Sequence, residues 1–151
     1  MQKLSWDEVE NRADELANKI AASGFAPEFL VGITLGGLIP LTLLAKQLKI
    51  KDVLTIHAHS YEKTEKKDLL IKYPPNADLR GKRVLLVDEI ADTGETLRAI
   101  SKILTEEYGA ILKTAVLVRK KTCSFTPDFS VIETDAWVVF PWEKSESPPV
   151  F

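Results

Sequence analysis

Cysteine is nearly absent from this chain of 151 residues, which contains Cys123 alone. A single cysteine excludes an internal disulfide and favours a reducing compartment such as the cytoplasm. The N-terminal residues lack the apolar core of a signal peptide. The uncharged stretch 29–45 is short for a membrane span, and a glycine pair and a proline interrupt it. We therefore expect a cytoplasmic protein without a membrane segment.

Other absences exclude classes of function. The net charge is −2 and no dense basic stripe occurs, which disfavours a protein built mainly to bind nucleic acid. The two histidines, His57 and His59, alternate on one expected strand, but they have no apparent third ligand for a metal ion. No Gly-x-x-x-x-Gly-Lys sequence is present, which disfavours nucleotide hydrolysis. Cys123 lacks a recognisable neighbouring base, so we expect it to be inert.

The order of expected elements indicates an α/β fold. Ser5-x-x-Glu8 has the form of a capping box, and apolar residues recur at helical spacing from there to Gly24. Short apolar runs then alternate with helical segments. We expect strands at 29–33, 53–56, 83–87, 114–118, 129–132 and 137–140, and further helices after Pro40 and over 95–108. This alternation predicts a single domain, residues 1–151, with a mostly parallel sheet flanked by helices.

The segment 60–80 differs from its surroundings because it is polar, rich in Lys and Glu, and contains Pro74-Pro75. Either a long loop or a weakly paired hairpin would have this composition. Long loops in compact domains are often lids or binding loops. We therefore treat 60–80 as a candidate mobile binding segment.

The most informative junction follows the apolar strand 84–87. Two adjacent carboxylates, Asp88 and Glu89, end this strand, and the sequence 91–96 leads into a helix. Free N–H groups and the helix dipole attract an anion there, and threonine hydroxyls add donors. Carboxylates would repel a phosphate, so they should face sugar hydroxyls or a magnesium ion. Taken singly, Asp92 is better explained as an N-cap, and Asp88 and Glu89 as solvated loop charges; their occurrence together is what favours a binding site.

This junction resembles the signature of the type I phosphoribosyltransferases over about ten consecutive positions. The resemblance implies that 5-phosphoribosyl-1-pyrophosphate binds here, with Asp88 and Glu89 on the ribose hydroxyls. The residues implied to surround its 5′-phosphate are Ala91, Asp92, Thr93, Gly94, Glu95 and Thr96. In the 6-oxopurine branch of the family, the acid at the position of Asp92 faces the purine N7 and acts as general acid or base. The resemblance therefore implies a purine substrate.

A second junction, Leu35-Gly36-Gly37, resembles the family's pyrophosphate loop, whose backbone amides grip the leaving group. Most purine members have Arg or Lys where this chain has Leu35, so a cationic side chain is missing. Without the resemblance, the glycine pair is explained equally well as a strand-to-helix turn. Ser60 and Tyr61 resemble the start of the family's flexible catalytic loop, about 60–80, whose closure excludes water.

The segment of about 119–143 resembles the base-binding hood of bacterial and archaeal xanthine–guanine phosphoribosyltransferases. The resemblance implies that Trp137 stacks on the purine, that the backbone of Val138 reads the purine edge, and that Glu143 helps to place Mg²⁺. Arg119 stands where relatives have a lysine that donates to the purine O6. Lys120 is the alternative donor, because a guanidinium fork is not equivalent to an ammonium.

The ordinary alternative for Trp137 and Trp142 is core packing. Taken from Phe29 to Glu143, the resemblance implies a purine salvage enzyme that uses Mg²⁺ and joins guanine, hypoxanthine or xanthine to ribose 5-phosphate. It also implies a homodimer or a higher homo-oligomer, with no nucleic-acid partner. Two alternatives stay open. Leu35 keeps open a regulator that senses phosphoribosyl pyrophosphate, although the base-binding residues weigh for catalysis. A transferase for another base is disfavoured by Asp92 and the Trp137 segment.

Overall fold

The computed structural model describes residues 1–63 and 66–143, with the backbone alone for 59–63, 66–68 and 70. Its elements, in chain order, are β1 (Gln2–Lys3), α1 (Trp6–Ala22), β2 (Phe29–Ile33), α2 (Leu38–Leu48), β3 (Val53–Lys63), β4 (Lys66–Tyr73), β5 (Arg83–Ala91), α3 (Glu95–Glu106), β6 (Ile111–Lys120), β7 (Ile132–Thr134) and β8 (Val138–Val139).

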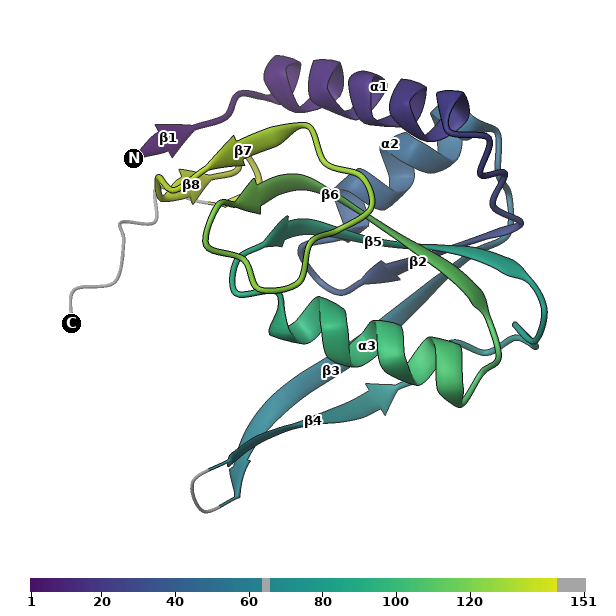
Figure 1. The fold of residues 1–151 in the computed structure, drawn as a ribbon. Helices are drawn as coiled ribbons and strands as arrows, with labels where there is room; N and C mark the ends of the chain where they lie inside the picture. The colour runs from purple at the N-terminus through teal and green to yellow at the C-terminus, as the bar shows by residue number, and fades with distance from the viewer. Residues whose placement is uncertain (64–65, 144–151) are drawn as a thin grey trace.

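A six-stranded sheet in the order β4-β3-β2-β5-β6-β7 forms the centre of the molecule. Its strands are parallel to their neighbours except for β4, which runs antiparallel to β3 at one edge. Helices α1 and α2 lie on one face of the sheet and α3 lies on the other (Figure 1). The prediction of a mostly parallel sheet flanked by helices is therefore confirmed.

The central strand β5 is buried on both faces, which explains why its sequence is an unbroken apolar run. Leu85 and Val87 pack into the cluster beneath α1 and α2. Val84 and Leu86 pack into the second cluster, beneath α3. These residues hold the carboxyl end of β5 between two helical layers, so the polar residues that follow have a rigid base.

The helix α1 begins as its sequence predicts. The Glu8 backbone N–H donates to Ser5 Oγ at 3.1 Å, and the Ser5 backbone N–H donates to Glu8 Oε2 at 2.9 Å. This is a complete capping box. The uncharged stretch 29–45 divides into β2, a turn and α2, and no helix among the described residues is long and apolar enough to cross a membrane.

The segment 60–80 forms a hairpin over most of its length. The backbone of β3 pairs with β4 from His57↔Tyr73 to Lys63↔Lys66, with an irregularity between His57 and Ala58. Residues 64–65 lie outside the described part of the chain. The hairpin alternative is therefore correct for the paired residues, and the expected strand at 53–56 is too short, because polar residues continue it.

The last strands differ most from prediction. Only a single bridge, Ala115↔Phe129, forms where a strand was expected at 129–132, and β7 begins at Ile132. The strand expected at 137–140 is reduced to β8, which pairs with β1 through Gln2↔Val138 and Lys3↔Val139. The prediction missed β1, because a two-residue strand has no periodicity and depends on a partner more than a hundred residues away.

Candidate functional site

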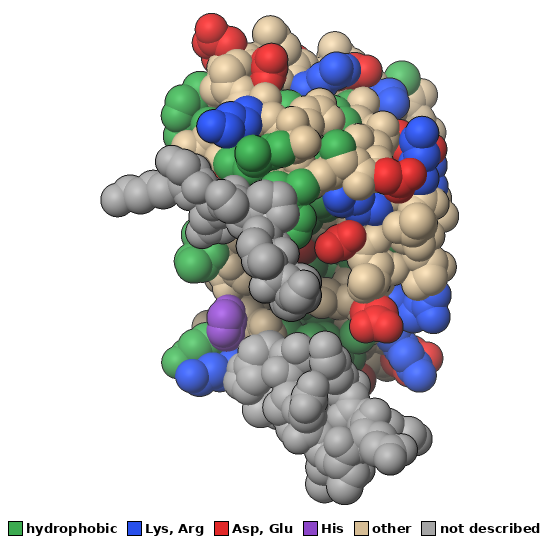
Figure 2. Space-filling view, turned by 90° about the vertical axis from the view of Figure 1, so that its left-hand side faces the viewer, with side chains coloured by type: hydrophobic (Ala, Val, Ile, Leu, Met, Phe, Trp, Pro, Cys, Tyr) green, Lys and Arg blue, Asp and Glu red, His purple; other side chains and the backbone are tan. Residues whose placement is uncertain are grey.

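β2 and β5 are neighbouring central strands whose carboxyl ends lie at the same end of the sheet, where Gly32 pairs with Val87. Figure 2 looks onto this side of the molecule, where hydrophobic and acidic side chains are both exposed. Two connections leave this end side by side. They are the β5–α3 junction (residues 88–96) and the β2–α2 loop (residues 34–37). Their contact is tight, because a Cβ on Gly37 would lie 2.7 Å from the carbonyl oxygen of Val87.

The β5–α3 junction ends in a helix N-terminus whose cap is Gly94, with φ at +88°. Asp92 is therefore not the N-cap, and the simplest alternative explanation for this acid is wrong. The side chains of Asp92, Thr93, Glu95 and Thr96 are exposed. The Glu95 backbone N–H donates to Thr93 Oγ1 at 3.3 Å. A helix N-terminus beside exposed threonine side chains is an arrangement that favours an anion.

The segment 123–125 buttresses this junction from the side, a contact that sequence reasoning missed. The backbone N–H and the hydroxyl of Ser124 each donate to the carbonyl oxygen of Thr93 at 2.9 Å. A Cβ on Gly94 would lie 2.9 Å from Cys123 Sγ and from the backbone nitrogen of Phe125. Gly94 is therefore required both by its positive φ and by the close approach of this segment.

The strand expected at 83–87 is too short, because β5 continues to Ala91 and includes both acids. These two acids have different surroundings. Asp88 is half-buried as a residue, but its carboxyl group is enclosed, and burial raises its pKa to about 7. A hydrogen bond from the Glu89 backbone N–H, at 2.8 Å to Asp88 Oδ1, lowers this pKa, and the charge of Glu89 raises it further. The carboxylate of Glu89 accepts a hydrogen bond from Trp142 Nε1 at 3.0 Å.

The β2–α2 loop has no ionisable side chain. The peptide bond Thr34–Leu35 is cis, and the Leu35 side chain is 80% exposed. Thr34 Oγ1 lies 2.8 Å from His57 Nδ1, so the loop is attached to β3. Gly36 has no room for a side chain, because a Cβ there would lie 2.4 Å from the carboxyl carbon of Glu89. The absence of side chains at Gly36 and Gly37 thus allows the β2–α2 loop to lie close to the β5–α3 junction.

The cationic residues at the end of β6 both contact protein groups. Arg119 forms an ion pair with Glu133 of β7, with 2.6 Å between Nη2 and Oε2. Lys120 Nζ donates to the carbonyl oxygen of Ala136 and lies 3.4 Å from that of Asp135. Glu133 was not singled out from the sequence, and only the parallel register Arg119↔Glu133 brings it here.

The hood residues are partly exposed and partly buried. Trp137 is 38% exposed and Val138 is buried. The carbonyl oxygen of Trp137 accepts from the Gln2 backbone N–H at 2.7 Å, so the N-terminus holds this segment in place. Full burial of Trp137 in the core is therefore wrong. Trp142 is half-buried and contacts the α1–α2 cluster, as the core-packing alternative expects.

Glu143 closes a turn at the end of the described chain. Its Oε2 accepts from the Phe140 backbone N–H at 3.0 Å, and its own N–H donates to the Phe140 carbonyl at 3.0 Å. Over residues 1–63 and 66–143, no group of three or more His, Cys, Asp or Glu side chains is placed to hold a metal ion. The backbone of Ser60 and Tyr61 lies in β3, and their side chains lie outside the described part.

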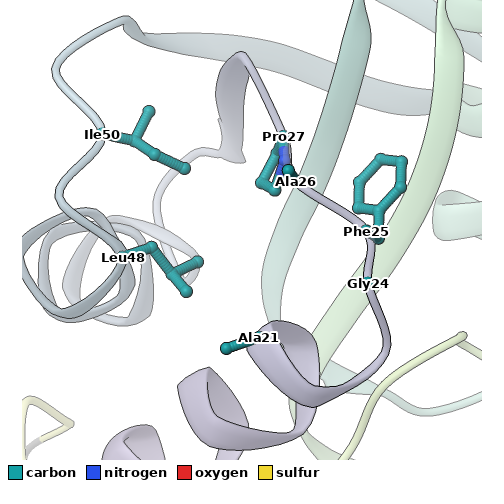
Figure 3. Close-up of a pocket in the computed structure, with 7 residues that line it drawn as sticks. All are labelled: Ala21, Gly24, Phe25, Ala26, Pro27, Leu48 and Ile50. Carbon is teal, nitrogen blue, oxygen red and sulfur yellow. The ribbon is translucent and has the colours of Figure 1, made fainter.

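A hollow of about 250 Å³ lies at the opposite end of the sheet, before the start of β2 (Figure 3). Its lining residues are Ala21, Gly24, Phe25, Ala26, Pro27, Leu48 and Ile50. No acid, base or hydroxyl group is among them. The chemistry-bearing residues therefore gather at the carboxyl end, where ligands bind in parallel sheets of this kind.

Comparison with known proteins gives one consistent result. The sequence profile described as a phosphoribosyl transferase domain matches residues 5–146. Xanthine-guanine phosphoribosyltransferase from Chromohalobacter salexigens is 30% identical over 140 residues, covering 93% of this chain and 82% of the relative. The corresponding protein from Cereibacter sphaeroides is 29% identical over 145 residues, covering 93% of this chain and 85% of the relative.

Solved structures agree with the sequence relatives. A purine phosphoribosyltransferase from Pyrococcus horikoshii superposes with a TM-score of 0.85 at 34% identity, covering 99% of this chain and 97% of that one. Xanthine-guanine-hypoxanthine phosphoribosyltransferase from Helicobacter pylori superposes with a TM-score of 0.83 at 26% identity, covering 94% and 93%. Nearly the whole described fold is therefore shared with these two proteins.

Proposed function

Because the chain belongs to the phosphoribosyltransferase family, we propose that it transfers the 5-phosphoribosyl group from phosphoribosyl pyrophosphate, the donor, to a 6-oxopurine. Guanine, hypoxanthine and xanthine are the candidate acceptors, and pyrophosphate is released. The observation that carries this proposal is the β5–α3 junction. It combines a helix N-terminus, two exposed threonine side chains and four carboxylates within nine residues.

The donor is recognised by three groups of atoms in this proposal. Backbone amides and hydroxyls of residues 91–96 hold its 5′-phosphate, since a helix N-terminus favours an anion. Asp88 and Glu89 accept hydrogen bonds from the ribose hydroxyls. Backbone amides of the β2–α2 loop hold the pyrophosphate. The contact between Gly36 and Glu89 supports this division, because it places the two loops next to each other.

The purine is held by the hood. The exposed face of Trp137 stacks on the base, and the backbone of Val138 reads its edge. Arg119 or Lys120 donates to the purine O6. The bond of Lys120 to the Ala136 carbonyl supports a role in holding the residue before Trp137, which leaves Arg119 as our first choice for O6.

The reaction breaks the bond from the sugar C1′ to a pyrophosphate oxygen and forms a bond from C1′ to a purine nitrogen. Positive charge develops on the sugar, and positioning with electrostatic stabilisation provides most of the rate. Asp92 holds or removes the proton at the purine N7 as general acid or base. Its exposed position at the surface of the junction supports contact with a substrate.

Magnesium belongs to the same proposal. Mg²⁺ typically binds through one or two carboxylates together with substrate phosphates, and Glu143 with the donor's pyrophosphate is a set of this kind. Because Glu143 Oε2 accepts the Phe140 N–H, Oε1 is the atom that would contact the ion. The bound ion would neutralise charge on the departing pyrophosphate. We also propose a cytoplasmic homodimer or higher homo-oligomer, with residues 1–151 as a single domain.

The test measures pyrophosphate release from the donor and Mg²⁺, with guanine, hypoxanthine, xanthine, adenine and orotate offered separately. Turnover with at least one 6-oxopurine and little with adenine or orotate is the expected result, and it identifies the preferred base. Donor binding without turnover of any base would instead favour the sensor hypothesis. The exposed apolar side chain of Leu35 is the observation that keeps that second candidate.

A further inference from the structure

Glu89 is held between two parts of the chain that are distant in sequence. On one side its carboxyl group lies against Gly36, where an added Cβ would come within 2.4 Å of Cδ and Oε1. On the other side Oε2 accepts the indole N–H of Trp142 at 3.0 Å. The carboxylate therefore lies between the β2–α2 loop and the C-terminal segment, with Gly36 on one side and the Trp142 indole on the other.

Trp142 is itself fixed in orientation. Its ring stacks on that of Phe140 with centroids 4.7 Å apart and planes 11° apart. Phe140 is 1% exposed, so this stacking surface belongs to the core. The Trp6 ring lies 6.0 Å from the Trp142 ring on a tilted approach. Aromatic packing therefore fixes the direction in which the indole N–H points.

The turn that contains Trp142 is closed by two hydrogen bonds. The Glu143 N–H donates to the Phe140 carbonyl, and the Phe140 N–H donates to Glu143 Oε2, each at 3.0 Å. Such a turn presents the intervening side chain in one direction. The aim of the Trp142 indole is consequently set by the backbone as well as by its ring neighbours.

We propose that Trp142 is a positioning residue for donor binding, because its indole N–H holds the Glu89 carboxylate beside the β2–α2 loop. The inference rests on the proposed function, in which Glu89 accepts hydrogen bonds from the donor's ribose. An indole suits this task because it is a neutral donor with a single N–H. It orients the carboxylate without neutralising it, so the carboxylate keeps the charge that makes it a strong acceptor.

The position of Trp142 also couples two parts of the site. Four residues separate it from Trp137, and the buried strand β8 lies between them. The segment that stacks on the base in our proposal therefore also orients the acid that contacts the ribose. A hydrogen bond to a charged group contributes about 1.5–3 kcal/mol, and 1.4 kcal/mol corresponds to tenfold in affinity. We expect donor affinity to fall roughly tenfold without the indole N–H.

The experiment compares Trp142→Phe, which keeps an aromatic ring but removes the N–H, with Trp6→Phe in the same aromatic cluster. The donor dissociation constant is measured calorimetrically with Mg²⁺, beside thermal unfolding and the KM values for donor and guanine. Both substitutions are repeated in a Glu89→Ala background, which removes the acceptor of the indole N–H. We expect Trp142→Phe to raise the donor dissociation constant and donor KM about tenfold, with guanine KM changed less than twofold.

In the Glu89→Ala background, Trp142→Phe should have less than a twofold further effect, and Trp6→Phe should leave donor affinity unchanged in either background. The inference is overturned if Trp142→Phe binds donor normally, if its effect is the same with Glu89→Ala, or if Trp6→Phe weakens binding equally. A wild-type protein that binds donor but converts no purine would overturn the proposed function alone, since these binding comparisons still hold. Failure of the wild type to bind donor would overturn both.

Discussion

The β5–α3 junction and the β2–α2 loop occupy equivalent places at the ends of neighbouring strands, yet their chemistry is opposite. The junction has four acids, among them Asp88 with its raised pKa, two threonine hydroxyls and a glycine with positive φ. The β2–α2 loop has no charge, and its most exposed side chain is Leu35. Two neighbouring parallel strands therefore place two loops in similar positions, and the residues of each loop determine which groups it can bind.

In the proposed function, this difference assigns the unlike parts of one ligand to different groups of the protein. Side chains are needed where the ligand presents hydroxyl groups and a proton to be moved. Backbone amides suffice where it presents only phosphate oxygens. The glycine pair also allows the β2–α2 loop to contact the β5–α3 junction, because Gly36 leaves space for the Glu89 side chain. Substitutions of acids in the β5–α3 junction should therefore change the rate of the reaction, whereas substitutions in the β2–α2 loop should change mainly donor affinity.

The largest expected effect belongs to Asp92, which distinguishes the chemical role of the junction from a role in binding. Asp92→Asn keeps the size of the side chain but removes its proton-transfer capacity, so kcat should fall about 10²–10⁴-fold. Donor affinity should change less than about threefold, because amides and hydroxyls hold the phosphate. Glu106→Gln, an exposed acid at the far end of α3, is the control. Near-normal turnover in Asp92→Asn would remove the acid–base role.

A second effect concerns the pH dependence that burial gives to Asp88. Its pKa rises from 3.8 to about 7 on folding, so the folded protein binds this proton more tightly than the unfolded chain does. The associated stability is fully present below about pH 4 and is lost as the pH rises through about 7. The full difference corresponds to about 4 kcal/mol.

Urea unfolding of wild type and Asp88→Asn at pH 5 and pH 8 measures this contribution. We expect wild type to lose more stability than the variant between these two values. Donor affinity should change in the opposite direction, rising with pH in the wild type, because the ionised carboxylate is the better acceptor for ribose hydroxyls. Parallel pH profiles of stability for the two proteins would contradict the assignment of this proton to Asp88.

Gly94 tests how much the junction depends on the buttress at 123–125. Gly81 provides a matched control, because it too has a positive φ, +70°, but nothing lies within 4 Å of an added Cβ. Gly81→Ala should cost about 1–2 kcal/mol from backbone strain alone. Gly94→Ala adds a clash with Cys123 and Phe125 and should cost about 1–3 kcal/mol more. Equal losses of unfolding free energy in Gly94→Ala and Gly81→Ala would show that residues 123–125 move aside to accommodate the added methyl group.

The two regions also differ in how far the sequence predicts them. The β5–α3 junction is continuous in sequence, so its strand, acids, glycine and helix start are all visible in one short segment. Its capping was misjudged only in detail, because Asp92 was a possible N-cap and Gly94 takes that place. The apolar run of β5 fixes its burial on both faces without reference to the rest of the chain.

The hood could not be predicted in the same way, because its geometry comes from distant partners. The Glu133 partner of Arg119, the Ala136 carbonyl that binds Lys120 and the hydrogen bond from Gln2 to Trp137 all depend on tertiary register. The bond from Trp142 to Glu89 spans 53 positions and has no local signal. For Trp142 the sequence supported core packing, which accounts for the position of the ring but not for the hydrogen bond that its N–H donates to Glu89.

The smallest expected effect is a gain, and it tests whether the β2–α2 loop binds through its backbone alone. Leu35→Arg replaces an 80% exposed apolar side chain with a guanidinium beside the proposed pyrophosphate position. A partly exposed ion pair contributes about 0.2–1 kcal/mol, so donor affinity should rise about two- to fivefold. The gain should shrink at high salt, since the added charge is screened.

Thr42→Arg adds the same charge at an exposed position farther along α2 and serves as the control. A salt-sensitive gain with Leu35→Arg, absent from Thr42→Arg, would show that the loop faces an anion and that the wild type holds it with uncharged groups. Equal affinities for Leu35→Arg and wild type at low salt would mean that the Leu35 side chain points away from the bound donor. The chemical contrast between the two loops would then lie in their backbones alone.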